Sequence, residues 1–327
     1  MLALITGATG FIGSHLAEHL AARGYNLRFF VRGSSNLKWI RHLNPDYVHG
    51  DFFDAQSLMN AVRGVDAIYH VAGVVASRTK AGFFKGNQHA TRNLLQAVQK
   101  ANPSLSRFVH VSSQTAVGPS PPDKPIDENA SYHPVTTYGK SKMEAEKEVM
   151  KFDGVMPWTI IRPPAVYGPR DVATFDFFHS ASRGLLPLVG FERKLVSLVH
   201  VRDLVSGIVL AGEKKEGRNQ SYFIGSERFY DWEEIAETTL RVLGRRALKI
   251  HVPEPAVFAI AGIAGLFSVF SKKPSVLNWE KGRDMVQKAW TCDITKAKKD
   301  LGYKETIGLE DGIRETVAWY KKEGWMR

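Results

Sequence analysis

A glycine-rich turn at the start of the chain constrains its fold more than any other feature. The apolar run Leu2–Thr6 leads into a turn with glycines at positions 7, 10 and 13, and a helical pattern follows over residues 11–23. Such glycines permit a tight turn, a close approach of the backbone to a pyrophosphate, and close packing of helix and strand. The N–H groups that open the helix bind phosphate. The turn predicts a dinucleotide site formed by Gly7, Thr9, Gly10, Phe11, Ile12 and Gly13.

Short β-rich runs alternate with amphipathic stretches through the first half of the chain. The predicted strands are Leu2–Thr6, Asn26–Val31, Tyr47–Val48, Ala67–Val71, Phe108–Val111 and Thr159–Ile161. The predicted helices between them lie near residues 11–23, 55–63, 87–100 and 139–152. Apolar strands separated by helices are typical of a parallel sheet that is covered on both faces. We therefore predict an α/β fold built on a doubly wound parallel Rossmann sheet.

The alternation weakens after about residue 165. Two later runs, Leu198–Leu210 and Ser221–Gly225, are interpreted as returns to the sheet region. Helical patterns then cover residues 231–243, 255–270, 294–300 and 309–322. The predicted division is a Rossmann domain of residues 1–165 and 196–226, and a smaller, mostly helical C-terminal substrate-binding lobe of residues 166–195 and 227–327. This lobe would lie over the strand ends, where open α/β sheets bind ligands.

The charge balance and the cysteine count restrict the partners. The chain has 44 Lys and Arg against 33 Asp and Glu, a formal net charge of +11. The basic residues are scattered and no nucleic-acid motif is visible, so a solvated surface that attracts a phosphorylated cofactor is favoured over a nucleic-acid partner. Cys292 is the single cysteine and has no Cys or His neighbours at ligand spacing, so we predict no disulfide and no metal site. No signal peptide is recognisable, and we expect a cytoplasmic protein.

One apolar segment bears on membrane contact. Ala256–Phe270 carries no charge, but its 15 residues are fewer than the roughly 20 needed to span a bilayer. A buried helix, a helix lining an apolar pocket and a helix resting on a membrane all fit this segment. Membrane contact through residues 256–270 is the less favoured of these interpretations.

The end of the second strand bears on the choice of cofactor. Arg32 lies 19 residues after Gly13, and no Asp or Glu occurs between Arg23 and Asp46. An acid near this position binds the ribose 2′-hydroxyl of NAD, whereas an arginine suits the 2′-phosphate of NADP. We therefore favour NADP(H), with NAD(H) as the alternative and Lys38 as a second phosphate ligand. Arg32 could also be an ordinary solvated loop residue.

The ends of the next two strands also fit a cofactor. Asp51 and Phe52 follow the third strand, where an adenine ring would lie. Val71, Ala72 and Gly73 follow the fourth strand, and small residues there would let a cofactor pass close to the backbone. These positions are predicted to be cofactor contacts.

Three polar residues form the predicted catalytic group. Ser113 ends the fifth strand, and Tyr138 and Lys142 stand four residues apart on one face of a predicted helix. The lysine charge is expected to lower the tyrosine pKa from about 10, so that Tyr138 exchanges a proton with a carbonyl or alcohol oxygen that Ser113 also holds. The alternative is a surface Tyr–Lys pair with a strand-end serine, since each feature is common on its own.

Together these residues resemble the extended short-chain dehydrogenase/reductases. The resemblance implies that Lys142 also contacts the nicotinamide ribose and that Pro163, Ala165 and Val166 lie against the carboxamide. It places the adenine at Asp51 and Phe52. It also matches Asn87 to a family asparagine near the reacting centre, although Ala90 stands where the family usually has glycine. Members are often dimers, so a homodimer is possible.

Departures from the family pattern indicate the branch. The dehydratases carry Thr-Asp-Glu where this chain has Ser113, Gln114 and Thr115, and nucleotide-sugar enzymes carry asparagine where this chain has Ala165. The chain looks more like dihydroflavonol reductases and 3β-hydroxysteroid dehydrogenases. The favoured function is thus an NAD(P)-dependent oxidoreductase that interconverts a ketone and a secondary alcohol on a largely apolar small molecule. The alternatives are a nucleotide-sugar epimerase with tightly held NAD and, more remotely, a non-catalytic cofactor-sensing regulator.

Overall fold

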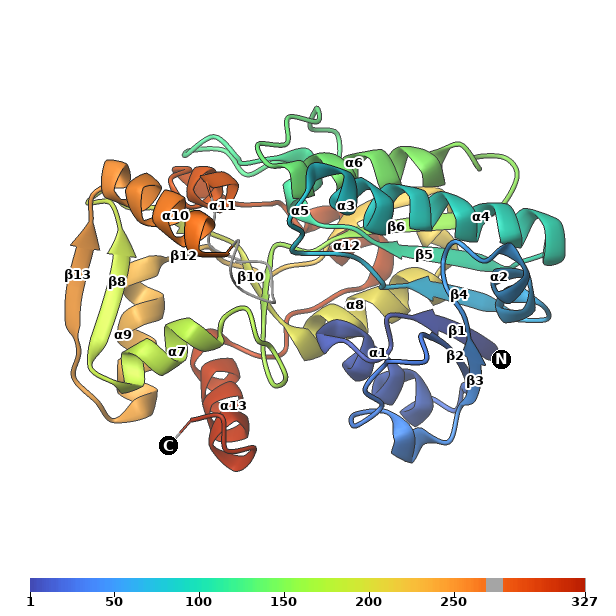
Figure 1. The fold of residues 1–327 in the computed structure, drawn as a ribbon, viewed down its shortest axis with the longest axis horizontal. Helices are drawn as coiled ribbons and strands as arrows, with labels where there is room; N and C mark the ends of the chain where they lie inside the picture. Colours follow the sequence, from blue (N-terminus) through green and yellow to red (C-terminus); the bar gives the residue numbers. More distant parts are fainter. Residues whose placement is uncertain (269–278, 327) are drawn as a thin grey trace.

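A seven-stranded parallel sheet forms the centre of the N-terminal lobe in the computed structural model, which describes residues 1–268 and 279–326 (Figure 1). The strand order is β11-β6-β5-β4-β1-β2-β3, and every neighbouring pair is parallel. The strands are β1 (Leu2–Thr6), β2 (Asn26–Val31), β3 (Asp46–His49), β4 (Ala67–His70), β5 (Arg107–Val111), β6 (Trp158–Arg162) and β11 (Gln220–Phe223). The predicted strands of the first half are all present.

Helices cover both faces of this sheet. One face carries α1 (Phe11–Ala22) and α8 (Val201–Glu213), which contact each other. The other face carries α2 (Ala55–Val62), α4 (Ala90–Ala101) and α6 (Thr137–Met150). Strand β1 shows why the sheet is double-faced: Ala3 and Ile5 join one apolar cluster and Leu4 joins the other, and all three are fully buried. The doubly wound Rossmann sheet is confirmed.

The interpretation of Leu198–Leu210 as a return to the sheet is wrong. Strand β10 (Leu198–His200) pairs with β7 (Ala165–Tyr167) in a separate two-stranded sheet, and the remainder of the run is α8. The apolar residues of α8 recur at helical spacing, with Val201, Leu204, Val205 and Ile208 all buried. The second predicted return is correct, because β11 pairs with β6 at the edge of the main sheet.

The C-terminal lobe contains more strands than the sequence indicated. Its helices are α7 (Phe175–Ser182), α9 (Trp232–Leu243), α10 (Glu254–Ser268), α11 (Trp279–Met285) and α13 (Leu309–Lys322). Strands β8 (Leu185–Val189) and β13 (Leu248–Val252) form a parallel pair, and β12 (Tyr230–Asp231), β9 (Leu195–Val196) and β14 (Ala289–Trp290) form a three-stranded sheet. Of the predicted helix 255–270, residues 269 and 270 lie outside the described residues. None of the described helices is long and apolar enough to cross a membrane.

One C-terminal helix returns to the Rossmann sheet. Helix α12 (Thr295–Leu301) contacts α8 and β11. Cys292, Ala297 and Tyr303 are buried in the same apolar cluster as α1 and α8, and the Tyr303 hydroxyl donates to the Gly225 carbonyl at 2.9 Å. The residue-level division into two lobes stays a prediction. The remaining short helices are η1 (Arg41–Leu43), α3 (Lys80–Phe84), the π-helix η2 (Lys85–His89), α5 (Gln114–Val117) and η3 (Lys215–Gly217).

Candidate active site

The glycine turn links β1 to α1 beside the end of β4. Gly7 has a φ of +76°, and a Cβ there would lie 2.6 Å from the backbone nitrogen of Ala72. A Cβ at Gly13 would lie 2.1 Å from the Gly7 carbonyl oxygen. Gly10 is the N-cap of α1 and has no side chain to occupy the first N–H groups of the helix. The turn therefore fits the phosphates of a dinucleotide, because no side chain covers these donors and the positive end of the helix faces them.

The two predicted phosphate ligands after β2 lie in different surroundings. Arg32 is exposed, and within residues 1–268 and 279–326 its side chain forms no ion pair. Lys38 lies 2.8 Å from a carboxylate oxygen of Glu323 and 4.1 Å from the centre of the Trp39 ring. Arg32 is therefore available to bind an anion, whereas Lys38 is already paired with Glu323.

Three residues in the loop after β3 differ in their contacts and in their exposure to solvent. The Asp51 carboxylate accepts a hydrogen bond from the backbone nitrogen of Phe53 at 2.8 Å. The Phe52 ring packs 5.3 Å from the Phe30 ring and 5.7 Å from the His70 ring. Phe53 is 47% exposed. The aromatic ring presented to solvent at the predicted adenine position is therefore that of Phe53, which sequence reasoning did not select.

The residues after β4 are fixed by a buried threonine. The Thr6 carbonyl accepts from the backbone nitrogen of Val71 at 3.1 Å, and the Thr6 hydroxyl accepts from that of Ala72 at 3.3 Å. The same hydroxyl bonds His70 Nδ1 at 2.7 Å. Burial lowers the pKa of His70 to about 3, so the ring is neutral. This contact network positions the predicted cofactor-binding segment from Val71 to Gly73 against the glycine turn.

Asn87 connects that segment to the catalytic helix. It lies in η2 and is buried. Its side-chain amide donates to the Val74 carbonyl at 3.0 Å and to Ser141 Oγ at 2.8 Å, and its Oδ1 accepts from the Val74 nitrogen at 2.7 Å. A Cβ on Gly73 would lie 3.1 Å from this Oδ1 and 3.7 Å from Lys142 Nζ. Asn87 therefore lies beside the predicted catalytic lysine, and its amide is used to position the chain around it.

The structure brings the three predicted catalytic side chains together at the carboxyl end of β5. Ser113 is the N-cap of α5, and its Oγ accepts from the Thr115 nitrogen at 3.2 Å. Helix α5 packs against α6, and Ser113 lies near enough to the Tyr138 hydroxyl to lower its pKa. Lys142, one helical turn after Tyr138 on α6, donates from Nζ to the Val111 carbonyl at 2.7 Å. In this arrangement the hydroxyls of Ser113 and Tyr138 can both hydrogen-bond one substrate oxygen atom, next to the Lys142 ammonium.

The expectation that Lys142 lowers the pKa of Tyr138 is wrong. Burial raises the pKa of Tyr138 to about 12, the Ser113 hydroxyl opposes this rise, and the negative charge of Asp284 adds to it. Burial also lowers the pKa of Lys142 to about 8, against the opposing effect of Glu146. The physical reason is that the lysine ammonium is directed to a backbone carbonyl, so its charge does not offset the desolvation of the phenol. Tyr138 therefore holds its proton at neutral pH and can act as an acid.

Helix α11 contacts the start of the catalytic helix. The Glu280 carboxylate accepts from the Thr137 nitrogen at 2.9 Å and from the Thr137 hydroxyl at 2.5 Å. Asp284 follows one turn later, and its backbone carbonyl accepts from Trp290 Nε1 at 3.0 Å. Negative charge at a helix N-terminus is stabilising. Sequence reasoning missed both acids, because Glu280 lies 143 positions from Thr137 and belongs to no local motif.

A buried ion pair begins one helical turn after Lys142, the predicted catalytic lysine. Glu146 and Arg162 pair at 2.7 Å, and their side chains are 0% and 3% exposed. Glu146 also accepts from Ser112 Oγ at 2.5 Å and from the Tyr132 hydroxyl at 2.6 Å. The sequence did carry one signal for this network, because Glu146 stands four residues after Lys142 on the same helix face.

The predicted carboxamide contacts lie next to the catalytic group. The Pro163 carbonyl accepts from the backbone nitrogen of Gln114, the residue after Ser113, at 2.8 Å. Pro163 is buried, Val166 is partly buried and Ala165 is exposed at the start of β7. The segment therefore borders the site and presents a small side chain at its edge.

Comparison with known proteins identifies the family. The sequence model of the NAD dependent epimerase/dehydratase family matches residues 3–225. The chain belongs to this family. It is therefore an NAD-dependent enzyme of the short-chain dehydrogenase/reductase type, and the resemblance drawn from its motifs is confirmed.

Related proteins align with nearly the whole length of this chain. It is 30% identical to the ceramide reductase of Caulobacter vibrioides, over 98% of this chain and 95% of the relative. It is also 30% identical to the 3 beta-hydroxysteroid dehydrogenase/Delta 5→4-isomerase of Mycobacterium tuberculosis, over 97% and 90% of the two chains. The crystal structure of gox2253 is 27% identical, with a TM-score of 0.84 over 100% of this chain and 99% of the other.

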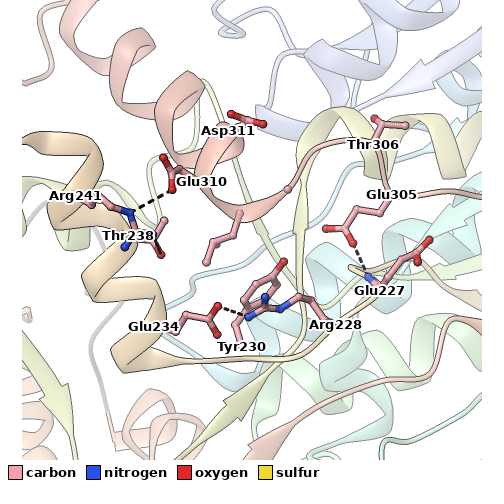
Figure 2. A pocket seen from close by; sticks show the side chains of 12 residues that line it. Glu227, Arg228, Tyr230, Glu234, Thr238, Arg241, Glu305, Thr306, Glu310 and Asp311 are labelled. Carbon is pink, nitrogen blue, oxygen red and sulfur yellow. Dashed lines mark hydrogen bonds and ion pairs between the residues drawn. The ribbon is translucent and has the colours of Figure 1, made fainter.

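A cavity outside the catalytic group of this family member lies between α9, β12 and the start of α13 (Figure 2). Its volume is about 680 Å³, and both acidic and basic side chains line it. Arg228 pairs with Glu234, and Arg241 pairs with Glu310 at 3.2 Å. Acidic side chains outnumber the two arginines in its lining, and none of the predicted site residues lines this cavity. We therefore assign it no role in the family's chemistry.

Proposed function

We propose that this enzyme interconverts a ketone and a secondary alcohol on a largely apolar small molecule. The observation that carries the proposal is the meeting of Ser113, at the N-cap of α5, with Tyr138 and Lys142 of α6 at the carboxyl end of β5. Burial raises the pKa of Tyr138 to about 12. A protonated phenol beside a serine hydroxyl is suited to give its proton to a carbonyl oxygen as that oxygen gains negative charge.

The surroundings of the phenol support an apolar substrate. The Phe83 ring centre lies 6.3 Å from that of Tyr138. Ala165 stands where nucleotide-sugar members of the superfamily carry asparagine, so the amide that would meet a diphosphate is missing. The relatives named ceramide reductase and 3 beta-hydroxysteroid dehydrogenase act, by their names, on molecules with large apolar bodies.

Each catalytic residue has a defined part in this proposal. A bound nicotinamide would supply or accept the hydride. Tyr138 transfers the proton to or from the substrate oxygen, and Ser113 holds that oxygen by a hydrogen bond. Lys142 lies beside Gly73, in the segment expected to border the cofactor, and is expected to contact the nicotinamide ribose. Asn87 keeps this segment and α6 in register through its bonds to Val74 and Ser141.

We further propose that the enzyme prefers NADP(H). The support is Arg32, an exposed guanidinium with no ion-pair partner in the described part of the chain, at the strand end where the 2′-position of the ribose would lie. Calorimetric titration should show tighter binding of NADPH than of NADH. Arg32→Ala should remove about 1.5–3 kcal/mol from NADPH binding alone. Equal binding of the two cofactors, or tighter binding of NADH, would contradict this preference.

The catalytic proposal is tested by Tyr138→Phe. With NADPH and a panel of apolar ketones, the variant should lose roughly 10²- to 10⁴-fold in turnover, while calorimetry shows unchanged cofactor binding. Tyr25→Phe, a change in a tyrosine that bonds Glu213 outside the catalytic group, is the matched control. Retained turnover in Tyr138→Phe would refute the assignment. Purified protein that carries non-exchanging nicotinamide and acts on nucleotide sugars would instead establish an epimerase.

A further inference from the structure

The parallel pair β8–β13 has one covered face. Leu186 and Leu188 are buried there in an apolar cluster with Ala181 of α7 and Ala236 of α9. On the same face Lys249 Nζ bonds a carboxylate oxygen of α9 at 2.7 Å. Both charged and apolar side chains of this face therefore have partners within the lobe.

The outer face of the pair is apolar and open. Side chains alternate between the two faces of a strand, so Leu185 pairs with Leu248, and Pro187 with Ile250, on the outer face. Leu185 is 47% exposed, Leu248 is 65% exposed and Ile250 is 43% exposed. Val189 and Val252 form the next pair along. Figure 1 shows β8 and β13 at one extremity of the molecule, with α9 behind them.

Three arginines border this apolar face at one end. Arg183 precedes the start of β8 by two residues, and Arg245 and Arg246 precede the start of β13 by three and two residues. Because the strands are parallel, these segments begin at the same end of the sheet, and the Leu248 nitrogen donates to the Gly184 carbonyl there at 2.9 Å. All three arginines are exposed, and none forms an ion pair with the residues that the structure describes.

We propose that the outer β8–β13 face and its three arginines dock onto an anionic lipid surface. The proposal rests on the proposed function, because an apolar substrate is concentrated in a lipid bilayer. Charge selects this occupant over a second copy of the chain. Glu233 and Glu237 of α9 are engaged with His251 and Lys249 on the covered face. The acids beyond the far ends of the two strands, Glu192 and Glu254, pair with Lys288 and Lys194. A second copy of this face would thus offer the arginines only carboxylates that already have partners, whereas anionic headgroups provide phosphates.

The outer β8–β13 face is connected to helix α6 through helices α10 and α11. Helix α10 begins two residues after β13 and contacts α11, whose Glu280 binds the N-terminus of α6. Ile260 on α10 is 48% exposed. The lipid-facing sheet and the helix that carries Tyr138 are therefore joined by two consecutive helices. Docking would bring the substrate-binding lobe to the phase that contains an apolar substrate.

Vesicle flotation with the full-length protein tests the proposal. We expect binding to vesicles of equal parts phosphatidylcholine and phosphatidylglycerol, and much weaker binding to phosphatidylcholine alone. Arg245→Ala with Arg246→Ala should weaken binding about 30-fold, since each basic residue at an anionic surface contributes about 1 kcal/mol. Leu248→Ser with Ile250→Ser should weaken it about tenfold or more, because less apolar area enters the interface. Val155→Ser, at a residue that is 57% exposed outside the lobe, is the control and should bind as the parent does.

Three outcomes would overturn docking: no flotation of the parent protein, undiminished flotation of both double variants, or a dimer that the Leu248/Ile250 change dissociates without any vesicle binding. The last result would show that the face joins two copies. Both double variants replace exposed side chains, and their thermal unfolding should match the parent. Turnover of a water-soluble ketone should also be unchanged in them. Vesicle binding needs no substrate, so failure of docking and failure of the proposed reductase activity are separately visible.

Discussion

Lys142→Met should stabilise the protein at neutral pH while abolishing turnover. Burial lowers the pKa of Lys142 from 10.5 to about 8. The difference of about 2.5 units corresponds to about 3 kcal/mol at about 1.4 kcal/mol per unit. This is the free energy that the folded state loses by keeping the buried ammonium charged. Methionine has a similar length and carries no charge, so it removes this penalty and also the hydrogen bond to Val111.

The sign of the pH dependence follows from the lowered pKa. Below about pH 8 both folded and unfolded states carry a charged lysine, and the full penalty is present. Between about pH 8 and 10.5 the unfolded state binds more protons than the folded state, so the penalty disappears as pH rises. The stability advantage of Lys142→Met should therefore shrink by about 3 kcal/mol between neutral pH and about pH 10.5.

Urea unfolding of parent and variant across this pH range measures the difference directly. Lys140→Met, on the exposed side of the same helix, is the matched control, and its difference from the parent should stay nearly flat. Parallel stability curves for the parent and Lys142→Met would refute the reasoning, because they would mean that the lysine keeps its ordinary pKa in the folded state.

Three further changes test other parts of the site. Glu146→Gln should cost about 3–5 kcal/mol in urea unfolding, because it leaves the buried Arg162 without its charge partner; a loss below 1 kcal/mol would contradict this role. Glu280→Gln should weaken the charged cap on the catalytic helix by about 1 kcal/mol and lower kcat/KM roughly fivefold, and unchanged kinetics would show that α11 does not position Tyr138. Gly7→Ala should abolish cofactor binding in calorimetry. Gly24→Ala also has a positive φ but meets no atom within 4 Å, so it should bind normally.

Local patterns predicted most of the Rossmann lobe. Strands β1 and β2 begin and end at the predicted residues, because both are apolar runs buried on two faces and bounded by turn residues. The grouping of Ser113, Tyr138 and Lys142 at one end of the sheet could be predicted because they stand at a strand end and at helical spacing, and their catalytic role stays a prediction. Such features depend on residues close together in the chain and need no knowledge of tertiary contacts.

What the sequence did not predict depends on distant contacts. The run Leu198–Leu210 joins a three-residue strand directly to a helix, and the packing of its helical part against α1 and β5 separates the two. The pKa of Tyr138 depends on burial and on the charge of Asp284, neither of which a five-residue motif contains. The Glu280 cap joins α11 to α6 across 143 positions of the chain. Short strands such as β9 have too few residues for a periodic pattern.

The return of residues 291–303 to the first lobe has a consequence for biosynthesis. Ile126 exchanges backbone hydrogen bonds with Thr291 and Asp293, and Cys292 and Tyr303 occupy the core beside α8. A nascent chain that has emerged only as far as β11 has all seven sheet strands but an open gap in the core that they enclose. The cofactor-binding lobe can therefore complete its packing only after nearly the whole polypeptide has left the ribosome. A fragment ending near residue 226 should expose apolar surface and aggregate, although it contains the entire dinucleotide turn and catalytic group.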